Sequence, residues 1–298
     1  MIWSECIAST TIAAKKVHSL NFILEKKMKR YLGLILASTV LFASIEAYAA
    51  TKHSSKTTET LVYQVQGFNQ DMGTALIKID RKRGKVSKLM GEFKSEGTLQ
   101  KFYPMENRQV TYVDHRGNPK KTFQKRTERS VTENFNIKYK RQKVQVFYER
   151  GGKKSNRVRK SPNAVQDILS ALYSVAEWKA KDGSSMEMTM FSGKQFYKVQ
   201  VTAAGLEQIW TPLRGVEDAR RVNVIIERIS GSRKGEKSKI TLWVDSKSSG
   251  QLLKAAHHFK YVGDVVVVLK ERSVEVNSRK RLAKAKSVKE KLKVRRKK

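Results

Sequence analysis

Three methionines at alternate positions are the side chains with the clearest chemical potential in this chain. Met186, Met188 and Met190 lie two residues apart, so on a β-strand they share one face. Their thioether sulfurs are soft ligands of the kind that hold Cu(I). Softness is the only feature that supports a metal, and flexible methionines also suit a core or a cavity wall. We therefore expect no metal site and no cofactor.

The histidines and acids do not form a recognisable catalytic pattern. His257 and His258 are adjacent, so on a strand they point to opposite faces and cannot readily share a metal. Asp114 and His115 could pair as acid and base, but the run Asp-His-Arg-Gly-Asn-Pro is typical of a turn. Asp167 suits a capping or surface role. We predict that the protein is not an enzyme, with an unrecognised hydrolase as an alternative.

Residues 28–49 have the charge and apolar order of a secretory signal peptide. Lys29 and Arg30 precede an apolar run, and Ala47-Tyr48-Ala49 follows it, which predicts cleavage before Ala50. Residues 1–27 are then explained by a start codon placed too early. The single cysteine lies in that stretch, so the exported chain forms no disulfide. We predict a periplasmic or secreted protein.

The chain is strongly basic, with a formal net charge of +35. The segment 278–298 holds twelve Lys or Arg and one acid, and residues 50–277 keep a charge of +21. A field of this sign attracts polyanions such as anionic lipid, cell-wall polymer or nucleic acid. A solvated basic surface without a ligand is the alternative.

Most of the mature chain has the pattern of β-strands. Apolar residues alternate with polar ones at 61–66, 135–140 and 240–245, and we count about twelve such runs by this criterion. Turn residues at Ser192-Gly193, Ala204-Gly205 and Gly263-Asp264 predict hairpins. We therefore expect one β-rich domain over residues 60–277, built as a curved antiparallel meander sheet or open half-barrel. A closed lipocalin-like barrel is the alternative, and residues 50–59 are predicted to be a disordered leader.

One segment has helical spacing instead. Ser161 and Pro162 suit the cap and first position of a helix, and the apolar stripe that follows predicts an amphipathic helix over 162–180. The stripe consists of Val165, Ile168, Leu169, Leu172 and Ala176. Such a helix buries this face on the sheet.

Basic and aromatic residues interleave at 138–141 and 147–150. A platform for single-stranded nucleic acid has a similar composition. Export argues against that partner, and a strand with a charged outer face explains the same residues. We expect no nucleic acid.

The order of several motifs resembles a known family. The motifs are ETLVYQVQGFNQDMGTALIKI, FYPMENRQVTYVD, VQDILSALYSVAE, GLEQIWTPLRGVEDARRVNV and ITLWVDS. Over residues 59–271 they are similar to the bacterial exported family called domain of unknown function 3108. After ITLWVDS the chain departs from the family, which usually has a proline there. The resemblance implies a periplasmic fold similar to the half-barrels of lipoprotein and lipid carriers, and it implies no reaction.

These observations favour a non-enzymatic binding or carrier protein for a hydrophobic or anionic envelope component, either lipid or lipoprotein. The candidate pocket lining is Leu172, Trp178, Met186, Met188 and Met190. The alternative is an envelope structural protein that its basic surface and tail hold on anionic polymer or on the membrane surface. The candidate residues for this contact are Arg279, Lys280, Arg281, Lys284, Lys286, Arg295 and Arg296.

Deletion of residues 278–298 should leave the melting temperature nearly unchanged, because this basic segment has few large apolar residues to bury. It should weaken binding to anionic vesicles and flatten the salt dependence, since each Lys or Arg near such a surface contributes about 1 kcal/mol. Thermal melts and vesicle sedimentation at several salt concentrations check this. Unfolding on truncation, or unchanged vesicle binding, would contradict the tether.

Overall fold

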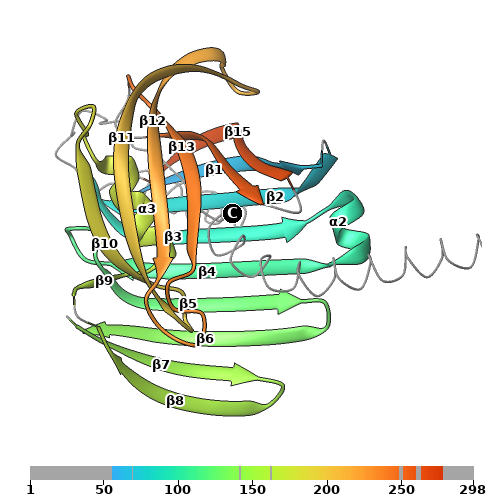
Figure 1. Ribbon diagram of the computed structural model, residues 1–298, viewed down its shortest axis with the longest axis vertical. Coiled ribbons are helices and arrows are strands. Elements are labelled where there is room, and N and C mark those ends of the chain that lie inside the picture. Colours follow the sequence, from blue (N-terminus) through green and yellow to red (C-terminus); the bar gives the residue numbers. More distant parts are fainter. Residues whose placement is uncertain are drawn as a thin grey trace, which may run out of the picture. The chain divides into compact units, whose positions relative to one another are not determined.

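The computed structural model describes residues 56–68, 70–140, 142–161, 163–247, 251–259 and 263–277. The predicted signal peptide and the basic tail lie outside these residues. The described part consists of fifteen strands and two helices (Figure 1). Neither helix is long and apolar enough to cross a bilayer.

The elements are β1 (Lys56–Gly67), β2 (Gln70–Lys82), β3 (Lys85–Ser95), α2 (Gly97–Phe102), β4 (Met105–Val113), β5 (Pro119–Glu128), β6 (Val131–Lys140), β7 (Lys143–Arg150), β8 (Lys153–Lys160), β9 (Val165–Gln166), α3 (Ile168–Glu177), β10 (Ser185–Phe191), β11 (Phe196–Thr211), β12 (Gly215–Arg228), β13 (Lys237–Asp245), β14 (Leu252–Phe259) and β15 (Gly263–Asn277).

All fifteen strands belong to one sheet. Its order is β8-β7-β6-β5-β4-β3-β2-β1-β15-β14-β13-β12-β11-β10-β9, so two antiparallel meanders meet where β1 pairs with β15. Only β9 and β10 pair in parallel among the described strands. The predicted open antiparallel meander is confirmed, and the closed barrel is wrong. Closure fails because β9 has two residues and β8 presents a highly charged edge, which disfavours further pairing.

One face of the sheet, which we call the inner face, carries the core. The alternation predicted at 61–65 and 240–244 is confirmed, since Leu61, Tyr63, Leu242 and their alternate neighbours are buried. The opposite, outer face carries the residues between them. Burial of one face per strand also fixes the register, because a slip of one residue would move every apolar side chain to the outer face.

The two distant ends of the sheet are joined by side chains. Phe135, Ile137, Val144 and Val146 from β6 and β7 form one buried cluster with Val165, Phe191 and Phe196 from β9, β10 and β11. The predicted Ser192-Gly193 turn is confirmed at this contact. Gly193 has φ +92°, and a Cβ there would lie 3.1 Å from the Phe135 ring, so a larger residue would strain the backbone and press on that ring. Packing, and not strand pairing, folds the sheet over itself.

An ion pair crosses the same contact. Lys194 Nζ, in the β10–β11 turn, lies 2.6 and 2.7 Å from the two carboxylate oxygens of Glu133 on β6. Tyr148 Oη donates to Glu133 Oε1 at 2.7 Å. Partial burial opposes the charged form, but the bonds from Lys194 and Tyr148 lower the pKa of Glu133. The carboxylate therefore stays ionised at neutral pH and holds the turn.

Helix α3 begins six residues later than the sequence predicts. The residues assigned to its first turn include Val165 and Gln166, which form β9 instead, and Ser161 is not its cap. Asp167 is the N-cap, and Ser170 completes a capping box with it. The capping role anticipated for Asp167 is confirmed. Asp and Ser are comparable N-caps, so the start of the helix is decided by the pairing of Val165 and Gln166 with β10.

Asp167 also attaches the helix to the sheet. Its Oδ2 accepts hydrogen bonds from the hydroxyls of Thr111 on β4 and Thr122 on β5, and its Oδ1 accepts from Ser170 N at 2.7 Å. The side chain is 2% exposed. A carboxylate so buried is tolerated because these donors replace water.

Two other predicted boundaries differ from the structure. Strand β1 begins at Lys56, inside the predicted leader, because Glu59 is buried and paired with Arg81 and Arg272, each at 3.0 Å. Ala204-Gly205 is a bulge within β11 and not a hairpin turn. Alternation and turn residues do not distinguish a bulge from a turn.

The C-terminal end of α3 holds a carboxyl group with a raised pKa. Burial raises the pKa of Glu177 to about 7, the positive charge of Arg81 opposes the shift, and Glu59 adds to it. Burial likewise raises the pKa of Tyr173 to about 12. Ionisation of Glu177 as the pH rises past 7 therefore places a charge in a partly buried site, which destabilises the packing of this helix end.

Leu172→Ala should lower the free energy of unfolding by about 2–5 kcal/mol, the usual cost of truncating a buried leucine, because Leu172 is 8% exposed on the docked side of α3. Chemical denaturation measures the change. The control is Lys179→Ala, which truncates an exposed side chain two residues after the end of α3. A loss below about half a kcal/mol, as at surface sites, would mean that the helix is not docked.

Glu177→Gln should stabilise the protein at pH 8 by about 1–2 kcal/mol, after discounting for solvent screening. The folded pKa of about 7 exceeds the ordinary value of 4.5, so the folded state binds the proton more tightly and loses stability as pH rises through 7. Below pH 4.5 the variant and parent should melt alike. Glu271→Gln, at an exposed position, is the control in these melts and should change stability little at either pH. An equal gain for Glu177→Gln at pH 8 and below pH 4.5 would contradict the raised pKa of Glu177.

Candidate functional site

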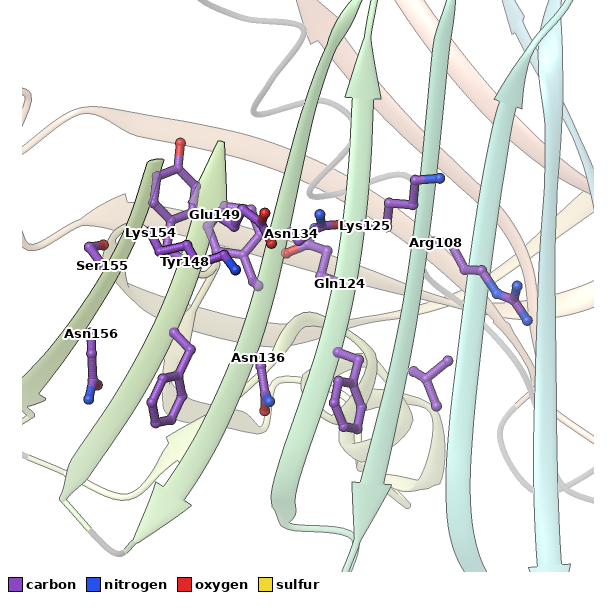
Figure 2. Close-up of a pocket in the computed structure, with 14 residues that line it drawn as sticks. Arg108, Gln124, Lys125, Asn134, Asn136, Tyr148, Glu149, Lys154, Ser155 and Asn156 are labelled. Carbon is purple, nitrogen blue, oxygen red and sulfur yellow. The ribbon is translucent and has the colours of Figure 1, made fainter. Parts of the chain in front are cut away.

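A groove lies over strands β4 to β8. Its volume is about 740 Å³, and Figure 2 shows its side chains on adjacent strands. The lining residues are Arg108, Val110, Phe123, Gln124, Lys125, Asn134, Phe135, Asn136, Phe147, Tyr148, Glu149, Lys154, Ser155 and Asn156. A concavity of this size suits a small-molecule or lipid-sized ligand.

The strand register arranges the outer-face members of this lining in two rows. The first, which we call the apolar row, consists of Val110, Phe123, Asn136, Phe147 and Asn156, each opposite the next across the strands. The second, the charged row, consists of Arg108, Lys125, Asn134, Glu149 and Lys154. The rows are two residues apart along each strand, which is about 7 Å. The groove therefore has one side that holds three apolar side chains and two amides, and one side that is mainly charged.

Aromatic rings on the apolar side are accompanied by lysines. Phe123 is 38% exposed, and Tyr112 packs edge-on against it with ring centroids 6.4 Å apart. Lys121 Nζ lies 4.2 Å from the centroid of Phe123, and Lys138 Nζ lies 5.6 Å from that of Phe147. The ring faces attract these ammonium groups electrostatically. Positive charge therefore lies at the border of the apolar row.

An amide separates the two phenylalanines. Asn136 stands between Phe123 and Phe147 in the register, and its Oδ1 is buried without a hydrogen-bond partner among the described residues. A buried polar atom without a partner costs free energy in an empty site. This position is therefore suited to a ligand that supplies a donor.

The bases of the charged row are weakly neutralised. Arg108 Nε lies 2.9 Å from Glu92 Oε1, with both side chains largely exposed. Within the described part of the chain, no ion pair joins Lys125 or Lys154 to an acid. The edge strand β8 adds Lys153, Arg157, Arg159 and Lys160 to Lys154. The groove therefore borders a surface that attracts anions.

The pocket lining expected from the sequence lies elsewhere in the fold. Leu172 and Met190 are buried, and Trp178, Met186 and Met188 are half-buried around α3 and β10. None of the five lines the groove on β4 to β8. Their role as a ligand pocket stays a prediction. The basic residues proposed in the tail, from Arg279 to Arg296, lie outside the described residues.

The histidines and Asp114 have local partners. His257 Nδ1 lies 2.6 Å from the Lys239 carbonyl, and burial lowers the pKa of His257. His258 Nδ1 pairs with Asp264 at 2.7 Å on the surface. Partial burial opposes the charged form of Asp114, but bonds from two backbone N–H groups lower its pKa, as expected of the predicted turn. Among the described residues no cluster of three histidines or acids is suited to a metal.

Sequence reasoning did not identify the groove, although one of its signals was visible. The interleaved basic and aromatic residues at 147–150 contribute Phe147, Tyr148 and Glu149 to the lining. Phe123 and Asn136 join them only through strand pairing. The alternation of each strand shows which residues face outward, but the register decides which of them meet.

Comparison with solved structures supports the fold. A beta-barrel-like protein of domain of unknown function DUF1849 from Brucella abortus aligns with 73% of this chain and 98% of its own, at 10% identity and a TM-score of 0.53. A protein with a YmcC-like fold from Bacteroides fragilis aligns with 78% of this chain and 99% of its own, at 9% identity and a TM-score of 0.30. The first likeness concerns the fold alone, and the second is too weak to support an argument.

Comparison with curated proteins finds no match. The family described as protein of unknown function DUF3108 matches residues 60–270, which is most of the chain and agrees with the resemblance seen in the motifs. This chain therefore belongs to the DUF3108 family.

Proposed function

We propose that the protein is an exported, non-enzymatic binding protein that takes an anionic amphiphile of the cell envelope in the groove on β4 to β8. The observation that carries this proposal is the separation of the groove into an apolar row and a charged row. An amphiphile with one acyl portion and one anionic portion has the same separation. The groove is a surface of the outer face, so a ligand enters it without displacing the core.

The apolar row supports contact with the acyl portion. Val110 on β4 and Phe123 on β5 lie opposite each other, and Phe147 on β7 follows beyond Asn136. Burial of such surface contributes about 25 cal/mol per Å². A chain laid across the strands contacts all three side chains at once.

The charged row supports contact with the anionic portion. Arg108, Lys125 and Lys154 outnumber the single acid of the row, Glu149. Arginine and lysine bind phosphate and carboxylate through charge-assisted hydrogen bonds. The signal-like segment at 28–49 supports the envelope as the place of action, and the charge of +35 supports an anionic partner.

Binding of a short-chain phosphatidylglycerol, measured by calorimetry below its micelle concentration, tests the proposal. The Phe123→Ser, Phe147→Ser double variant should weaken binding by about tenfold or more, because it removes the apolar contact with the acyl portion. The Lys125→Glu, Lys154→Glu double variant should weaken it as much, because it reverses the charge that attracts the anionic portion. A tenfold loss corresponds to about 1.4 kcal/mol. Phosphatidylcholine of the same chain length should bind more weakly than phosphatidylglycerol.

Matched controls lie on β15, far from the groove in the strand order. Val274→Ser removes an exposed apolar side chain and Lys270→Glu reverses an exposed charge, and neither should alter binding. A different outcome would identify the ligand as an anionic polymer and not an amphiphile. In that case only the lysine variant loses binding, and the parent binds a polyanion without an acyl chain as tightly as it binds phosphatidylglycerol. Unchanged binding in both groove variants would refute the site.

A further inference from the structure

Strands β11 and β12 extend beyond their neighbours. Strand β10 pairs with β11 only as far as Thr202, and β13 pairs with β12 only from Ala219 onward. Between these limits, residues 204–218 form a two-stranded ribbon that no other described strand flanks (Figure 1). We call this segment the ribbon tip.

One face of the ribbon tip carries large exposed apolar side chains. Leu206, Trp210 and Val216 are 64%, 62% and 66% exposed. Trp210 stands directly opposite Val216 in the register, and Leu206 lies on the same face as Trp210 by strand alternation. Trp210 and Val216 form a cross-strand apolar pair next to the turn, and Leu206 lies four residues before Trp210 on the same face. Single exposed apolar residues are ordinary, but three on one face of a short ribbon mark an interaction surface.

The other face of the ribbon tip is held in place. Ile209 and Thr211 are buried, as is Ala219, which follows the tip on β12. Arg214, at the turn, donates to Asp245 Oδ2 and to Gln251 Oε1, each at 2.6 Å.

Two further bonds join the ribbon to β13 and the residue that follows it. Trp243 Nε1 donates to Glu207 Oε2 at 2.9 Å, and Ser246 Oγ donates to the Asp218 carbonyl at 3.0 Å. The ribbon therefore cannot turn over to bury its apolar face, and the exposure of Leu206, Trp210 and Val216 is built into the fold.

The acids around the apolar face have basic partners. Glu217 lies 3.2 Å from Arg214 Nη1, Asp218 lies 3.6 Å from Lys247 Nζ, and Glu207 lies 4.0 Å from Arg221 Nη1. Arg214 also pairs with Asp245 at 2.6 Å, so the ribbon tip itself, with three acids and one base, is not basic. The attraction to an anionic surface comes from the rest of the chain, because residues 50–277 as a whole carry +21.

We propose that the ribbon tip docks the protein on an anionic lipid bilayer, with Leu206, Trp210 and Val216 entering the interfacial region. Tryptophan is the side chain most suited to that region, because its ring is apolar and its N–H bonds with headgroups. Stable association at a membrane surface combines apolar insertion with basic charge, and this chain supplies both.

Sedimentation with vesicles of phosphatidylglycerol and phosphatidylcholine tests this on the exported protein. A triple variant, Leu206→Ser, Trp210→Ser and Val216→Ser, should bind about tenfold or more weakly, because it removes the inserted apolar area. The side chains are more than half exposed, so the melting temperature should not change. Phe102→Ser, at 73% exposure on α2, is the matched control and should bind as the parent does.

A second measurement separates insertion from a general loss of affinity. Brominated lipids should quench the tryptophan fluorescence of the parent, and Trp210→Phe should retain binding while losing most of that quenching. Equal vesicle binding by the triple variant and the parent would overturn the proposal. So would a parent that is dimeric in solution and becomes monomeric in the triple variant, since the tip would then bind a second copy of this chain.

Discussion

The buried carboxylate of Asp167 is the contact on which the arrangement of helix and sheet depends. One of its oxygens starts α3 by accepting from Ser170 N, and the other accepts from the hydroxyls of Thr111 on β4 and Thr122 on β5. Because Asp167 is almost fully buried, its oxygens are hydrogen-bonded to these protein donors and not to bulk water. One residue thus fixes both where the helix begins and where it rests.

This anchor works together with the contact between the two ends of the sheet. Phe135 packs against the β10–β11 turn, and Lys194 holds Glu133 across the same contact. Part of the inner face is thereby covered by the chain's own side chains. The groove on β4 to β8 lies on the opposite, outer face, and the ribbon tip extends beyond the strands that flank β11 and β12.

The two candidate surfaces differ in the physical basis of their binding. The groove depends on the pairing of rows across strands, with Phe123 and Phe147 on one side and Lys125 on the other. The ribbon tip depends on a rigid attachment through Arg214, which the family-like motif GLEQIWTPLRGVEDARRVNV contains. This gives part of that motif a structural purpose, since Arg214 joins β11 and β12 to Asp245 of ITLWVDS. A protein that handles an envelope amphiphile benefits from both a ligand site and a membrane contact.

Local patterns in the sequence were enough to predict about twelve strands, the open meander and the Ser192-Gly193 turn, because alternation and turn residues act over a few neighbouring positions. The structure has fifteen strands, and the charged edge strand β8 has no apolar alternation that could reveal it. The same patterns placed the start of the helix wrongly. Val165 lies at helical spacing, but pairing with β10 and the bonds of Asp167 to Thr111, far away in the chain, outweigh that spacing. The groove also needed the tertiary structure. Which outward residues share a row is decided by register, and register is set by the burial of the opposite face across the whole sheet.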